Sequence, residues 1–127
     1  MNQFLLNGDL WRIRVVDPGS PMLVDRTGTK TVATTDPRTR CVYLSGEIHG
    51  EFLFRVLIHE LGHCAMISFD LLRDIRRLAR PEHWIEAEEW VCNFLADYGM
   101  AIFRIAFQWL GYDAWRIIPE ELENMIA

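Results

Sequence analysis

The sequence lacks the features that mark disulfide-bonded and exported proteins. It has three cysteines, Cys41, Cys64 and Cys92, and no CxxC pair. Such a set predicts no disulfide framework and favours a reducing compartment. Residues 1–9 contain neither a basic leader nor an apolar run of signal-peptide length, so we expect a cytoplasmic location.

Long apolar runs are also absent. The most apolar stretch, residues 98–110, is thirteen residues long and includes Arg104 and Gln108. A membrane-spanning helix needs about 20 apolar residues. We therefore expect no membrane partner, and we predict that this segment is buried in the core or forms an oligomer interface.

An excess of positive charge is missing as well. The formal net charge is −5, which argues against nucleic acid as the main partner. Arginines do cluster within residues 70–80, where they would form a basic face on an amphipathic helix. We interpret that face as solvated surface, with a substrate-docking patch as the alternative. By itself it is weak support for a DNA-binding regulator.

The composition that remains is that of a folded protein. Half of the 127 residues are hydrophobic and 12% are aromatic, as in globular rather than disordered chains. This length suits one domain with one core, so we expect residues 1–127 to form a single domain.

The first fifty residues follow the pattern of strands and turns. Residues 10–16 alternate apolar and polar side chains, as a half-buried strand does. Residues 22–24 are a weaker strand candidate. Residues 31–35 and 40–45 are β-rich runs on either side of a turn that contains Pro37, and this arrangement predicts a hairpin.

The second half follows a helical pattern. Residues 52–67 are apolar in nearly every direction around a helix, which predicts a buried helix. Pro81 should end the next helix, and Gly111 should end the last long one. We expect these further helices at residues 70–80, 82–99, 100–110 (continuous with the preceding helix or after a kink at Gly99) and 118–126.

The predicted buried helix carries His59-Glu60-Leu61-Gly62-His63, the HExxH arrangement. Histidines four residues apart lie one turn above each other, so both imidazoles can reach one metal ion. Glu60 lies close enough to act on a water at that metal without being a ligand. Gly62 costs a helix about 0.5–1 kcal/mol relative to alanine. Its presence predicts that another backbone or a substrate passes close by.

A zinc site of this type usually takes a third protein ligand. Carboxylates on the following predicted helix are the best placed, beside Cys92 and Ala96, whose small side chains would allow close packing. The spacing leaves the choice among these carboxylates open, although we expect Glu82 and Glu88 to be solvent-exposed. The polar residues that share one side of that helix are Glu82, Glu86, Glu89 and Asn93.

The HExxH motif followed by Glu89-Trp90-Val91-Cys92-Asn93-Phe94-Leu95-Ala96 resembles the ImmA/IrrE type of gluzincin metallopeptidase. The second helix of that family carries Glu-x-x-(Ala or Cys)-Asn-x-x-Ala. The predicted hairpin before the motif also resembles the family's hairpin, and the resemblance spans residues 31–97. It implies that His59, His63 and Glu89 bind zinc, that Glu60 is the general base and that Asn93 orients a ligand; Glu86 is the reserve ligand.

The resemblance also implies a fold and a function. The fold would be α+β, a minimal zincin-like domain in which a small N-terminal antiparallel sheet precedes an active-site helix and a second ligand-bearing helix. The activity would be that of a zinc metallo-endopeptidase of phage or prophage type, acting on a specific protein or peptide, for which a transcriptional repressor is a candidate. A non-catalytic, zinc-stabilised accessory protein is the alternative.

Further roles at such a site stay open on sequence alone. Tyr98, His83 and Tyr43 are candidates for stabilising a developing oxyanion, and Tyr98 is our choice for a catalytic role. An extended substrate would pair with the predicted strand at residues 40–45. We interpret Cys64 and Cys92 as small buried hydrophobes rather than metal ligands.

Overall fold

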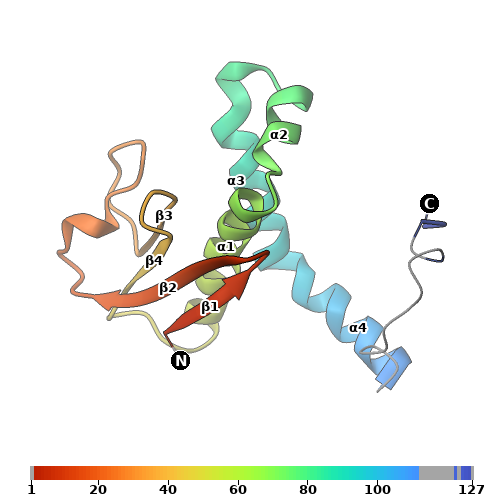
Figure 1. Cartoon of the computed structure of the whole chain (residues 1–127). Helices are drawn as coiled ribbons and strands as arrows, with labels where there is room; N and C mark the ends of the chain where they lie inside the picture. The colour runs from red at the N-terminus through yellow and green to blue at the C-terminus, as the bar shows by residue number, and fades with distance from the viewer. Residues whose placement is uncertain (1, 112–121, 123, 127) are drawn as a thin grey trace. The chain divides into compact units, whose positions relative to one another are not determined.

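A computed structural model of the chain describes residues 2–111, 122 and 124–126 (Figure 1). A four-stranded sheet precedes a series of helices, so the predicted α+β class is confirmed. By their internal contacts, the residues group into two compact units, Met1–Asp97 and Tyr98–Ala127. The sheet and the predicted metal ligands all belong to the first unit.

The sheet is mixed rather than wholly antiparallel. Its strands are β1 (Gln3–Leu6), β2 (Asp9–Val16), β3 (Ala33–Asp36) and β4 (Cys41–Ser45), in the order β1-β2-β4-β3. The pairs β1–β2 and β3–β4 are antiparallel, as expected, and the second pair is the predicted hairpin. Strand β4 lies parallel to β2, however. The long excursion between β2 and β4 lets the chain re-enter the sheet in the same direction, so the expected all-antiparallel pairing is wrong at that junction.

Strand β1 was not predicted, although the sequence holds a signal for it. Asn7 and Gly8 connect β1 to β2 and have φ values of 48° and 83°. Both values fit the two-residue hairpin turn that Asn-Gly favours. The strand predicted weakly at residues 22–24 is wrong, because Pro21–Leu23 forms a 3-10 turn, η1, with the Ser20 hydroxyl accepting a hydrogen bond from Met22 N–H.

The helices begin with α1 (Gly50–Ser68), which contains the HExxH motif, and α2 (Leu72–Leu78), which ends before Pro81 as predicted. The long helix expected at residues 82–99 is instead divided into a 3-10 turn, an α-helix and a π-helical turn. Gly111, with φ of 56°, follows the last described helix, as expected. These later segments are η2 (Pro81–His83), α3 (Trp84–Phe94), η3 (Leu95–Gly99) and α4 (Met100–Leu110). The predicted helix at 118–126 falls largely outside the described residues.

The core of the first unit lies between the sheet and α1, which Figure 1 shows against the strands. Trp11, Val42 and Cys64 are fully buried there, and Trp11 Nε1–H donates to Ser68 Oγ at 2.8 Å. The expectation that α1 is buried on all sides is wrong for its first turns, because Phe52 is half exposed.

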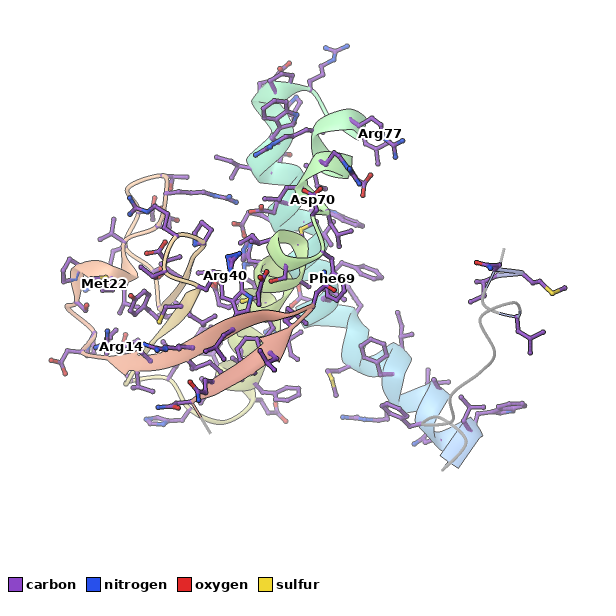
Figure 2. The ribbon with its side chains drawn as sticks, in the orientation of Figure 1. Arg14, Met22, Arg40, Phe69, Asp70 and Arg77 are labelled. Carbon is purple, nitrogen blue, oxygen red and sulfur yellow. The ribbon has the colours of Figure 1, made fainter. Side chains whose placement is uncertain are left out.

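The basic face on α2 is solvated, as predicted. Arg73 and Arg77 are mostly exposed and pair with Asp70 and Asp74, which precede them by three residues. Figure 2 shows Arg77 pointing outward from α2. Asp70, labelled beside Phe69 in Figure 2, has φ of 56° in the turn that separates α1 from α2.

No helix in the described part of the chain is long and apolar enough to cross a membrane by itself. Helices α1 and α2 together have the length and apolar composition of a span, with a bend of 87° between them. Within the second unit, α4 buries none of its side chains, and its predicted role as an interface stays a prediction.

Candidate metal centre

Helices α1 and α3 bring two histidines and one carboxylate together. His59 Nε2 lies 3.1 Å from His63 Nε2. The Glu89 carboxylate spans the pair, with Oε2 3.0 Å from His59 Nε2 and Oε1 3.3 Å from His63 Nε2. One donor atom from each residue lies within 4.8 Å of the others, and this group could hold a metal ion. It is the set that the motif and the resemblance predicted.

Gly62 allows the two helices to approach this closely. A Cβ atom built at Gly62 would lie 3.1 Å from Cys92 Sγ and 3.5 Å from Cys92 Cα. The prediction that another backbone passes close to Gly62 is therefore confirmed, and that backbone is the one of α3. Cys64 is fully buried in the hydrophobic core of the first unit, as a small hydrophobe is. Cys92 is fully buried at this crossing, where it also has His63 as a hydrogen-bond partner.

Glu88 belongs to the site, although we predicted from the sequence that it is solvent-exposed. It is in fact only 4% exposed, and its Oε2 lies 3.1 Å from His63 Nδ1. The same oxygen accepts a hydrogen bond from Arg26. Glu88 precedes Cys92 by one turn and therefore shares the face of α3 that packs on α1. That spacing was the available signal. Glu82 is exposed, as expected.

The carboxylates and histidines of the cluster shift one another's pKa values. Hydrogen bonds with His59 and His63 hold the pKa of Glu89 well below its ordinary value. Burial alone would raise the pKa of Glu88, but hydrogen bonds from His63 and Arg26 bring it below its ordinary value. Burial opposes the charge on His63, yet hydrogen bonds with Cys92 and the two glutamates raise its pKa to about 12.

These shifts describe a pocket of negative charge that attracts a cation. Arg26 and a proton on His63 supply the positive charges beside the two glutamates. Two imidazole nitrogens and a carboxylate oxygen are also a donor set that zinc takes in catalytic sites. The residues present therefore fit a divalent ion, both in chemistry and in charge.

Glu60 lies beside the cluster without belonging to the group of three. It is buried, and the hydroxyl of Thr35 on β3 donates a hydrogen bond to its Oε2. Thr35 also approaches the main-chain oxygen of Glu60 at 3.3 Å. Thr35 carries no motif signal and was not predicted. Its role arises because β3 lies next to α1.

The cluster opens into a cavity of about 910 Å³ between β3, the loop around Arg26, α1 and α3. His59, Glu60, His63, Glu88 and Glu89 all line it. Of the two strands that line it, β3 is the edge of the sheet, whereas β4, which contributes Tyr43, lies between β2 and β3. Our prediction that substrate pairs with residues 40–45 is therefore wrong, because an interior strand has both of its edges occupied.

The remaining predicted residues have other positions. Asn93 lines the cavity, but no hydrogen bond among the described residues joins it to the three candidate ligands, so its orienting role stays a prediction. Glu86 is exposed and pairs with His83 Nδ1 at 3.2 Å, away from the group of three. Tyr43 is buried at the cavity wall. Tyr98 begins the second unit, and its catalytic role stays a prediction.

Comparisons with protein-family models, with curated proteins and with solved structures found no match for this chain. The geometry of the cluster therefore carries the functional assignment, and membership of the ImmA/IrrE type remains a proposal.

Proposed function

We propose that the protein is a zinc-dependent metallo-endopeptidase of the ImmA/IrrE gluzincin type. The observation that carries this proposal is the meeting of His59, His63 and Glu89 in a cavity whose wall also contains the Glu60 carboxylate. A structural zinc site would more typically have four protein ligands and no cavity, since catalytic sites leave one position for water or substrate. The open side of this group favours catalysis.

His59, His63 and Glu89 would hold the zinc ion. Zinc bound there would polarise a peptide carbonyl and lower the pKa of a water molecule. Glu60 would accept a proton from the water that attacks the carbonyl carbon, and would return it to the amine as the C–N bond breaks. The hydrogen bond from Thr35 to Oε2 fixes the carboxylate and leaves Oε1 for the exchanged proton.

The substrate would be an extended segment of a specific protein lying along the edge of β3. Ser45 N–H donates to Val32 O at 2.8 Å. The alternation of an antiparallel pair then directs the main-chain groups of Thr34 toward β4 and those of Thr35 toward the open edge. A peptide pairing there would pass beside Glu60. Once a cleaved peptide is known, N-methylation at successive positions should block cleavage in an alternating pattern, and a uniform response would contradict edge pairing.

The function is tested by Glu60→Gln, which removes the base and keeps the size and shape of the side chain. Zinc should stay bound, because Glu60 lies outside the group of three, while hydrolysis should fall by about 10²–10⁴-fold. Zinc content by elemental analysis and cleavage of candidate protein substrates give the two readouts, with His59→Ala as the zinc-free control. Full biological activity in the Glu60→Gln protein would instead support the non-catalytic accessory protein.

A further inference from the structure

We propose that Arg26 is a positioning residue of the metal centre, which holds Glu88 against His63 and so directs His63 Nε2 toward the bound metal. This inference rests on the metal-binding part of the proposed function and does not depend on peptide hydrolysis. Arg26 lies 33 or more residues from every candidate ligand in the sequence, and no motif points to it.

The first step is a chain of contacts through one carboxylate oxygen. Arg26 Nη2 donates to Glu88 Oε2, and this same oxygen lies 3.1 Å from His63 Nδ1. Arg26 Nη2 also lies 3.2 Å from Glu89 Oε1. The Glu88 side chain is 5% exposed, so its charge depends on these protein partners rather than on water. Arg26 is the arginine that forms an ion pair with the Glu88 carboxylate.

The second step concerns the orientation of the histidine. A histidine that donates Nδ1–H to a carboxylate presents Nε2 as the metal-binding nitrogen. Glu88 can give His63 that orientation only while the carboxylate itself is held in place. Without Arg26, Glu88 Oε2 keeps only His63 as a polar partner within the described part of the chain. The carboxylate could then turn into the cavity and compete with Glu89.

The third step is the construction of the loop that carries Arg26. Asp25 Oδ1 accepts hydrogen bonds from Thr27 N–H at 2.8 Å, from Thr27 Oγ1 at 2.6 Å and from Thr29 N–H at 3.0 Å. Gly28 N–H donates to Asp25 O at 3.0 Å, and Gly28 has φ of 85°. Asp25, Thr27 and Gly28 thus hold the turn together, while the side chain of Arg26 leaves it to reach α3.

The positive charge of Arg26 would by itself repel a bound cation, so only its orienting role predicts that the loss of Arg26 weakens metal binding. Lysine supplies a point charge, whereas the planar guanidinium contacts two carboxylates in fixed directions. If Arg26 orients Glu88, Arg26→Lys should recover only part of the affinity that Arg26→Met loses. Tighter binding by Arg26→Met would assign Arg26 to charge balance alone and would overturn the positioning role.

The experiment measures metal affinity in purified full-length protein by competition with a chelator, using Zn²⁺ and Co²⁺. Arg26→Met should weaken Zn²⁺ binding by about 10–100-fold, the usual effect of removing a group that orients a ligand. It should also change the visible absorption spectrum of bound Co²⁺. Arg38→Met is the matched control, since Arg38 lines the same cavity but is 91% exposed and pairs with Asp36. Its affinity should stay within about twofold of the wild type.

A second variant keeps the inference testable if Arg26→Met folds poorly. Glu88→Gln should weaken binding to a similar extent. Arg26→Met added to Glu88→Gln should cause less further loss than it causes in the wild type, because the proposed effect of Arg26 on His63 acts through Glu88. Binding by Arg26→Met within about twofold of wild type, with an unchanged Co²⁺ spectrum, would overturn the inference alone. Failure of the wild-type protein to bind either metal would overturn the proposed function together with it.

Discussion

The two halves of the candidate site depend on different levels of structure. On α1, the pitch of a single helix places His59, Glu60 and His63, and their spacing in the sequence already describes the geometry. On α3, the neighbours Glu88 and Glu89 have different roles. Glu89 completes the group of three, and Glu88 contacts Nδ1 of His63, the ring nitrogen on the other side from that group. They differ in burial and in the nitrogen of His63 that each one faces, Nδ1 for the buried Glu88 and Nε2 for Glu89. Identical side chains side by side thus acquire different chemistry from their partners.

The largest effect should come from removing the two glutamates one at a time and comparing the loss of Zn²⁺ affinity. Glu89→Ala removes a ligand, and we expect Zn²⁺ affinity to fall by more than about 100-fold. Glu88→Ala removes only a supporting group and should cost about 10–100-fold. Isothermal titration or chelator competition measures both. Equal losses, or a larger loss for Glu88→Ala, would show that the two roles are assigned the wrong way round.

A smaller effect is expected at the helix crossing. Gly62→Ala should gain about 1 kcal/mol of helix propensity and lose about 1–3 kcal/mol by overpacking against Cys92. The net expectation is a loss of about 1 kcal/mol in the free energy of unfolding, measured in urea. Adding Cys92→Ala should relieve the overpacking from Gly62→Ala. Gly19→Ala, where a Cβ meets nothing within 4 Å, is the control for adding a methyl group. A stabilised Gly62→Ala protein would contradict the close approach of α3.

The smallest effect is the pH dependence of the metal-free protein. The pKa values of Glu88 and Glu89 lie below the ordinary 4.5, so their stabilising contribution is present above pH 4.5 and is lost as the pH falls through the lowered values. The pKa of His63 is raised from 6.5 to about 12, so its contribution is complete below pH 6.5 and declines as the pH rises toward 12.

Stability without metal should therefore be greatest between about pH 4.5 and 6.5. The urea midpoint should fall on both sides of this range by on the order of 0.5 M. Saturating Zn²⁺ should remove the alkaline decline, because the metal replaces the proton on His63. Urea titrations from pH 3.5 to 8.5, with and without a chelator, give the measurement. A midpoint that rises steadily up to pH 8.5 in the metal-free protein would count against this account of the cluster.

Much of the local structure could be predicted from the sequence because its causes are local. The Pro37-containing turn and its flanking β-rich runs predicted the β3–β4 hairpin, and Pro81 marked the end of the α2 segment. The Asn7-Gly8 pair held the same kind of information for the β1–β2 hairpin, although we did not use it. Each of these features depends on the φ values that one or two residues can adopt.

The amino-acid sequence by itself indicated the α+β class. It also determined that His59 and His63 reach the same point from α1, since helical pitch is the same in every fold. The tertiary structure decided that β3 is the edge strand beside the cavity, and that Arg26 and Thr35 contact the site. It also decided that Glu88 faces Nδ1 of His63 while Glu89 faces Nε2. The physical reason is that the strand order and the rotation of one helix against another depend on packing between residues far apart in the chain.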